Sequence, residues 1–176
     1  YGLQNIFTSV GFGEKNSQSL LTYAHNQSDG YRNHSSSKRD NVSFVSRYKI
    51  SGRQQLTAAV LYDNLFYETP GGLTKAEYLA NPKQARPAAG SFPSADASKA
   101  AIYQQNFTAG LNHAYNFTAA FKNSTSVYGS FAQVKNPTFR NYERRNEPGF
   151  GGRTSFIYDK KLKDADLKIV AGGEWQ

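Results

Sequence analysis

Apolar and polar residues alternate along most of this 176-residue chain, and helical spacing of apolar residues is scarce. A period of two predicts strands, because successive side chains of a strand point to opposite faces of the sheet. Clusters of Gly, Pro, Asn, Ser and charged residues separate the alternating stretches. We expect eight strands, at residues 3–12, 17–27, 39–50, 55–67, 100–115, 117–134, 150–160 and 165–175.

The connections between these strands alternate between tight and long. Tight turns are expected at 13–16, 51–54, around Asn116 and at 161–164, and long connections at 28–38, 68–99 and 135–149. In an up-and-down barrel every second connection lies on the same side of a membrane. The pattern therefore predicts an all-β fold, an antiparallel up-and-down transmembrane β-barrel segment with short periplasmic turns and long extracellular loops.

The two faces of the expected strands differ in chemistry. In 100–115, Phe107 and Leu111 share a face, while Thr108 and Asn112 lie on the other. The stretches 39–50, 117–134 and 165–175 divide in the same way, with some interruptions. We interpret one face as suited to lipid and the other, rich in Ser, Asn, Gln and Lys, as suited to a wet lumen.

Composition narrows the function classes. The chain has 25 aromatic residues, as 12 Phe, 12 Tyr and 1 Trp, and no Cys, which excludes disulfides and thiolate chemistry. Its net charge of +8 suits small anions and lipopolysaccharide phosphates, but dense Lys runs typical of nucleic-acid tails are absent. The histidines have no metal-ligand spacing. We expect no metal site, no cofactor, no nucleic-acid partner and no enzymatic activity.

Two passages carry a family resemblance. Residues 67–87, YETPGGLTKAEYLANPKQARP, and 136–158, NPTFRNYERRNEPGFGGRTSFIY, resemble extracellular loops of TonB-dependent outer-membrane receptors of the ferric-siderophore and ferric-citrate type. The resemblance implies uptake of a ferric chelate across the outer membrane of a Gram-negative bacterium. It also implies a 22-stranded barrel, of which residues 1–176 form about a third of the wall, and a plug domain that contacts TonB and is not present in this chain.

The first of these passages has a readable local structure. Pro70, Gly71 and Gly72 predict a tight turn. Thr74 is placed to cap a short helix over 75–80, and the Asn-Pro pair that follows ends it.

Ligand contact is expected from basic and aromatic side chains of the loops, since the resemblance implies an anionic chelate. The three long connections carry a mild positive excess of +4. Guanidinium groups bind carboxylates in pairs, which favours the densest group first. The candidates are Arg140, Tyr142, Arg144 and Arg145, then Tyr31, Arg32 and Arg39, then Tyr78 and Arg86. The alternative roles are solvated loops, a clamp on lipopolysaccharide phosphate and, for Tyr78, packing of the short helix onto the rim.

Three other functions remain open at this stage. A porin or a glycan importer shares the barrel and differs in its plug and loops. A soluble β-sandwich that binds carbohydrate or a cell surface requires both apolar faces to meet in one dry core. An outer-membrane hydrolase requires a dyad, for which the candidate is His34 near Asp29 and Asp40.

Overall fold

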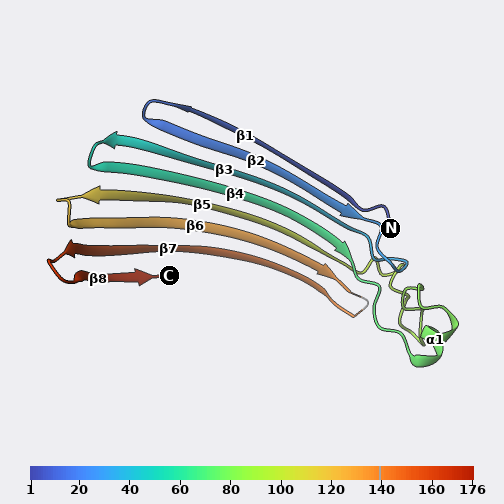
Figure 1. Cartoon of the computed structure of the whole chain (residues 1–176). Coiled ribbons are helices and arrows are strands. Elements are labelled where there is room, and N and C mark those ends of the chain that lie inside the picture. Colours follow the sequence, from blue (N-terminus) through green and yellow to red (C-terminus); the bar gives the residue numbers. More distant parts are fainter. Residues whose placement is uncertain (139) are drawn as a thin grey trace.

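The computed structural model describes residues 1–138 and 140–176 as eight strands and one short helix. Figure 1 shows the strands lying side by side in one curved sheet, with the helix α1 beyond one end of it. The elements are β1 (Gln4–Glu14), β2 (Ser17–Ser28), β3 (Ser37–Ser51), β4 (Gln54–Glu68), α1 (Lys75–Ala80), β5 (Ala101–Asn116), β6 (Phe121–Pro137), β7 (Tyr142–Lys161) and β8 (Asp166–Trp175).

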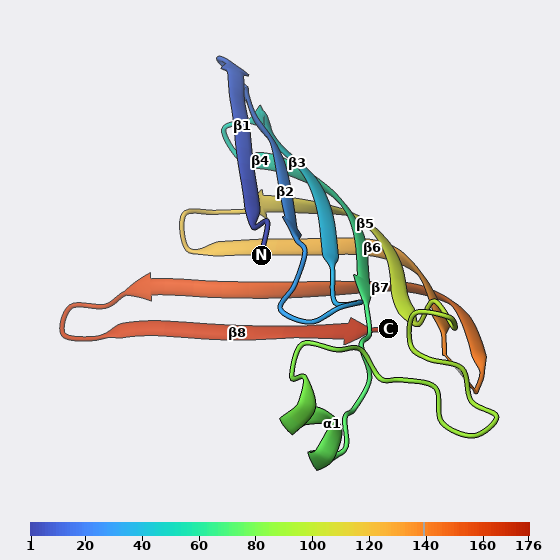
Figure 2. The same cartoon turned by 90° about the vertical axis from the view of Figure 1, so that its right-hand side faces the viewer.

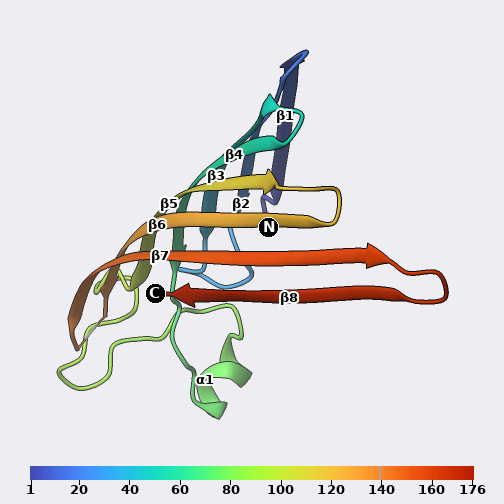
Figure 3. The same cartoon turned by 90° about the vertical axis from the view of Figure 1, so that its left-hand side faces the viewer.

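The sheet follows chain order from β1 to β8, and every neighbouring pair is antiparallel. It is an up-and-down sheet, as the sequence predicts. Figures 2 and 3 show a strong twist, from a steep β1 to a nearly horizontal β8. Six strands begin and end within two residues of their predicted positions, and the exceptions are β6 and β7.

Strand register separates apolar from polar side chains. One row of directly paired residues crosses six strands on one face, through Tyr23, Val42, Tyr62, Phe107, Phe131 and Pro148. The neighbouring row on the other face contains Thr22, Ser43, Leu61, Thr108, Ser130 and Gly149. We call these two surfaces the apolar face and the polar face. The division predicted for 39–50, 100–115 and 117–134 agrees with these two rows, and pairing joins the separate stripes into continuous surfaces.

Neither face is covered by the chain. Phe107, Leu111 and Phe131 on the apolar face are each nearly half exposed, at 46%, 48% and 46%. Among the described residues, the buried hydrophobic side chains are Ala85, Ala95, Ala100, Ala101 and Val134. The described residues therefore form one sheet without the dry core that a β-sandwich requires.

The connections are sorted to opposite ends of the sheet. Residues 15–16, 52–53, 117–120 and 162–165 make short turns at one end, which we call the turn end. Residues 29–36, 69–100 and 138–141 make the connections at the other end, the loop end, where Figure 1 also places α1. Within the described residues, no helix has the length and apolar character needed to cross a membrane.

The prediction of a long loop at 135–149 is wrong. Strands β6 and β7 continue through this region as a regular hairpin, in which Pro137 pairs with Tyr142 and Lys135 with Arg144. Pro148 belongs to the same hairpin and is paired in register with Phe131 of β6. The connection that remains, 138–141, is short.

The turn predicted around Asn116 lies at 117–120 instead, and β6 begins at Phe121 rather than at residue 117. Thr118 closes this turn: its backbone N–H donates to the Phe121 carbonyl oxygen at 3.1 Å, and its hydroxyl accepts from the backbone N–H groups of Ala120 and Phe121. A threonine side chain that competes for backbone N–H groups favours a turn over continued strand.

The helix prediction at 75–80 is confirmed. The Thr74 hydroxyl accepts from the backbone N–H of Glu77, and the Glu77 carboxylate accepts in return from the backbone N–H of Thr74 at 2.7 Å. This capping box fixes the start of a helix that is too short to be stable by itself. Gly71, in the predicted turn before it, has a φ of +73°.

Candidate functional site at the loop end

Connections 29–36 and 69–100 lie together at the loop end with Thr138, Arg140 and Asn141, and we call these residues the loop cluster. Arg32 joins the first two connections. Its guanidinium donates from Nε and Nη2 to the Gln84 carbonyl oxygen, at 3.0 and 2.9 Å, and from Nη1 to the Gly71 carbonyl oxygen at 2.7 Å. The backbone N–H of Asn33 donates to the Lys83 carbonyl oxygen. Arg32 therefore holds the cluster in shape.

His34 also joins connection 29–36 to connection 69–100 and to the end of β4. It has a φ of 56°, and its side chain is only 8% exposed. Its Nε2 lies 2.7 Å from the Ala100 carbonyl oxygen, and its Nδ1 lies 3.3 Å from Glu68 Oε1 and 3.2 Å from Asp96 Oδ1. Both ring nitrogens thus face oxygen acceptors from the 69–100 connection and the end of β4.

His34, the candidate member of a hydrolase dyad with Asp29 or Asp40, lies beside the carboxylates of Glu68 and Asp96. Asp40 lies on the apolar face of β3, where its carboxylate is 2.7 Å from His25 Nδ1 and accepts from the Tyr23 hydroxyl at 2.8 Å. Among the described residues, no group of three His, Cys, Asp or Glu side chains is arranged to hold a metal ion.

Arg86 and Arg140 make further contacts within the loop cluster. Arg86 donates from Nη2 to the Pro93 carbonyl oxygen at 2.5 Å and from Nη1 to the Pro87 carbonyl oxygen at 3.1 Å. The Arg140 guanidinium lies 5.0 Å from the centre of the Phe92 ring, which brings the β6–β7 hairpin tip against the 69–100 connection. Both guanidinium groups lie against groups of the protein itself.

A hollow of about 410 Å³ opens on the surface of the cluster, and we call it the loop hollow. Tyr31 and Tyr78 line it and are 52% and 58% exposed. The remaining lining residues are Arg32, Leu73, Thr74, Lys75 and Pro82. The structure thus brings Tyr31, Arg32 and Tyr78, which the sequence assigns to separate surfaces, into one concave site. The alternative role of Tyr78, packing of the short helix onto the rim, stays a prediction.

Two lysines add positive charge to this hollow. Lys75 lines it directly, and the Lys83 ammonium lies 5.8 Å from the centre of the Tyr31 ring. Sequence reasoning missed both as site residues, although they stand inside the 67–87 passage that carries the resemblance. The Thr74 backbone N–H, which donates to the Glu77 carboxylate, lowers the pKa of Glu77 below its usual value and keeps it ionised near the start of α1.

The predicted group of Arg140, Tyr142, Arg144 and Arg145 is not one site. Tyr142 and Arg144 lie on the apolar face, because they pair with Pro137 and Lys135. Arg145 lies on the polar face, where Glu143 and Glu147 approach its guanidinium to 2.9 and 3.0 Å.

Arg39 also lies on the polar face and is paired by Asp63, whose Oδ1 is 2.6 Å from its Nε. Because successive side chains of a strand point to opposite faces, the candidate residues of β7 are divided between the apolar and the polar face.

Comparison with known proteins gives a match in structure but none in sequence. No family model matches the sequence, and no curated protein matches it significantly. The structure is similar to the crystal structure of the ferric citrate transporter FecA in the unliganded form, with a TM-score of 0.79 over 98% of this chain. This likeness shows the fold alone, which is that of a β-barrel segment. Sequence identity to FecA is 16%, and the match covers 26% of the FecA chain.

Proposed function

We propose that the chain is part of the wall and extracellular rim of a TonB-dependent outer-membrane transport receptor that takes up an anionic ferric chelate. The observation that carries the proposal is the separation of the two faces. The described residues leave an apolar and a polar surface uncovered on opposite sides of one sheet, and all long connections lie at one end. Hydrocarbon on one side and water on the other satisfy both surfaces.

The dimensions of the apolar face support this placement. Phe107 and Tyr115 lie eight residues apart on the same face of β5. At roughly 3.3 Å per residue and a tilt of about 40°, they are separated by about 20 Å along the membrane normal, close to the roughly 25 Å apolar band of outer-membrane barrels.

Aromatic rings mark both edges of this band. At the turn end Tyr115, Phe117, Phe121 and Phe156 form a chain of ring contacts with centroids 4.7 to 6.1 Å apart. At the other edge Tyr23, Tyr62, Phe107 and Phe131 share the row already described. Aromatic girdles at both interfaces are typical of membrane barrels.

The loop hollow supports the choice of ligand class. Its two exposed tyrosines and nearby lysines offer ring faces, hydroxyl donors and positive charge to a flat anion. In the proposal the chelate binds first in this hollow. Arg32 holds the two connections that form the hollow in position. The complete protein then has about 22 strands and a plug that contacts TonB, supplied by sequence outside residues 1–176.

Uptake of radioactive ferric citrate and of a ferric hydroxamate by cells that carry the full-length protein tests the function. We expect uptake of at least one chelate that a protonophore abolishes, since TonB coupling needs proton-motive force. Replacing Tyr31 with Ala and Lys75 with Gln together should reduce that uptake about tenfold. Lys49→Gln, at the turn end, should leave it unchanged. Uptake that resists the protonophore would instead support the porin or glycan-importer alternative.

Chain orientation is tested separately. Residues 1–176 contain no cysteine, so each introduced cysteine is compared with the unaltered protein, whose labelling sets the background. We expect Ser91→Cys, in the 69–100 connection, to react with an impermeant maleimide in intact cells. Gly52→Cys, in a turn-end turn where a Cβ meets no atom within 4 Å, should react only after permeabilisation. Equal labelling at both positions in intact cells would contradict the membrane placement.

A further inference from the structure

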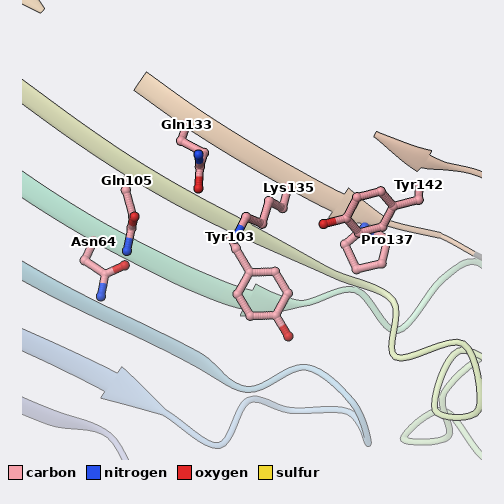
Figure 4. Close-up of a pocket in the computed structure, with 7 residues that line it drawn as sticks. All are labelled: Asn64, Tyr103, Gln105, Gln133, Lys135, Pro137 and Tyr142. Atoms are coloured by element: carbon pink, nitrogen blue, oxygen red, sulfur yellow. The ribbon is translucent and has the colours of Figure 1, made fainter. Parts of the chain in front are cut away.

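A second concave site lies on the apolar face near the loop end, away from the loop hollow. It encloses about 280 Å³ between β4, β5, β6 and the start of β7, and we call it the rim groove. Figure 4 shows the side chains that line it: Asn64, Tyr103, Gln105, Gln133, Lys135, Pro137 and Tyr142. Strand register places all of these residues on the same face as Phe107 and Phe131.

The groove is layered along the strands. Tyr62, Phe107 and Phe131 form the last apolar row. The next row towards the loop end is made of the amides of Asn64, Gln105 and Gln133, which are paired with one another in register, and Gln133 donates to Asn146 at 3.1 Å.

Tyr103 and Lys135 lie one row further out, paired with each other, and Pro137 and Tyr142 close the groove. Over four residues of β5 and of β6 the surface changes from hydrocarbon-like to hydrogen-bonding and then to cationic and aromatic. This order of chemistries matches an amphiphile that lies with its chains along the strands.

Positive charge in this region is uncompensated. Lys135 and Arg144 are direct cross-strand partners on one face, where like charges repel. Neither forms an ion pair within residues 1–138 and 140–176. Arg145, one residue along and on the polar face, is paired with two glutamates. An anion bound between Lys135 and Arg144 would relieve the repulsion.

We propose that the rim groove binds the phosphorylated sugar headgroup of an outer-leaflet glycolipid. The amides hydrogen-bond sugar hydroxyls, the rings of Tyr103 and Tyr142 pack on the sugar, and Lys135 with Arg144 bind a phosphate. The acyl chains then lie on Phe107 and Phe131. This inference rests on the membrane placement in the proposed function, but it assigns a lipid site on the outside of the wall, separate from the chelate site.

Native mass spectrometry of the full-length protein in detergent, titrated with lipid A, tests the site. Lipid A is an acylated glucosamine disaccharide that carries phosphates. We expect the K135Q/R144Q variant to bind it about tenfold more weakly than the unaltered protein. The matched control is K122Q/R153Q, which removes the same two charges from the same two strands on the polar face, and its binding should not change. Equal weakening in the two double variants would overturn the proposal.

The choice of probe separates a lipid headgroup from a free anion. Lipid A without its phosphates should bind the unaltered protein as weakly as lipid A binds K135Q/R144Q. Glucosamine phosphate without acyl chains should not compete at equal concentration, because the apolar row contributes. Full competition by the soluble sugar phosphate would show a simple anion site and contradict the lipid assignment.

The same variants distinguish this inference from the proposed function. K135Q/R144Q should still assemble in the outer membrane and still import the chelate, since neither residue lies in the loop hollow. Normal membrane assembly with unchanged lipid A binding would refute the rim groove alone. Absence of every form from the outer membrane would refute the proposed function instead.

Discussion

On strand β5, Ala109 and Thr108 are adjacent in sequence but stand in different surroundings. Ala109 is paired with Val60 and Gly129 in the middle of the apolar face, whereas Thr108 is paired with Leu61 and Ser130 on the polar face. The same contrast repeats at the rim. Within residues 1–138 and 140–176, Lys135 and Arg144 on the apolar face have no carboxylate partner, whereas Arg145 on the polar face has two.

In the proposed membrane placement, the sheet is organised by what lies outside it. A globular sheet buries one face against its own chain. Here the described residues bury neither face, and the charges of the two faces are balanced differently. The following predictions test whether the two faces differ as much in energy as they do in composition.

The largest effect is expected from Leu111→Arg compared with Thr108→Arg in the full-length protein. An arginine on the lipid face near mid-membrane costs about 2–4 kcal/mol, whereas lumen positions tolerate charge. We expect Leu111→Arg to lower the free energy of unfolding in lipid vesicles by that amount and Thr108→Arg to change it by well under 1 kcal/mol. Equal losses of unfolding free energy in the two variants, measured by urea titration, would contradict a difference between the two faces.

The next effect concerns the loop cluster. Gly71 has a φ of +73°, and a Cβ there would lie 2.9 Å from the Cβ of Arg86, whereas a Cβ on Gly72 meets nothing within 4 Å. Gly71→Ala should therefore destabilise the 69–100 connection by about 1–2 kcal/mol, while Gly72→Ala should not. Hydrogen exchange of residues 70–86 measures the difference, and unchanged protection in Gly71→Ala would contradict the described turn.

The next effect is smaller and concerns Arg145 and Arg144 at the rim. Their replacement should change the free energy of unfolding in opposite directions. Arg145→Gln removes two exposed ion pairs and should reduce stability by up to about 1 kcal/mol, less at high salt. Arg144→Gln removes a repulsive neighbour of Lys135 and should leave stability equal or slightly higher. Unfolding in a detergent without anionic lipid is the measurement, and a larger loss for Arg144→Gln would reverse the assignment of faces at the hairpin.

The smallest effect is the pH dependence of the α1 cap. Because the pKa of Glu77 is lowered in the folded protein, its stabilising contact is complete above the unfolded value of about 4.5 and is lost as pH falls through the folded value. The Thr74 amide resonance should titrate with a midpoint below 4.5. In Glu77→Gln that titration should disappear, and a midpoint above 4.5 would contradict the capping box.

Much of the fold could be predicted because alternation is a local property. A strand with one apolar face reads directly from neighbouring residues, as Phe107 and Thr108 show, and a one-residue slip of register would reverse both faces. The α1 helix was equally readable, since Thr74 and Glu77 form a capping box three residues apart.

The hairpin at 138–141 could not be read in the same way. Glu143, Arg145 and Glu147 alternate with Arg144 and Asn146, so both faces are polar and no apolar period remains. With Pro148 and Gly149 following, this composition is typical of a loop. Pairing with β6 decides the structure, and pairing is not a local signal.

The site was predictable only in part, for a similar reason. Arg32 was assigned to ligand contact from its type and place, but its guanidinium partners lie 39 and 52 residues further along the chain. The rim groove gathers residues from four strands, none of which forms a motif alone. Strand register brings the residues of such a site together. The sequence therefore predicts which residue types are suited to a site but not which of them are neighbours.

Spin labels on single cysteines at Ala109 and Thr108, in the full-length protein in outer-membrane vesicles, test the two-solvent sheet most directly. Collision rates with oxygen, which concentrates in lipid, and with a water-soluble nickel complex are measured at both positions. We predict that oxygen is favoured at residue 109 and the nickel complex at residue 108. Equal preferences at the two positions, or the reverse order, would contradict the account.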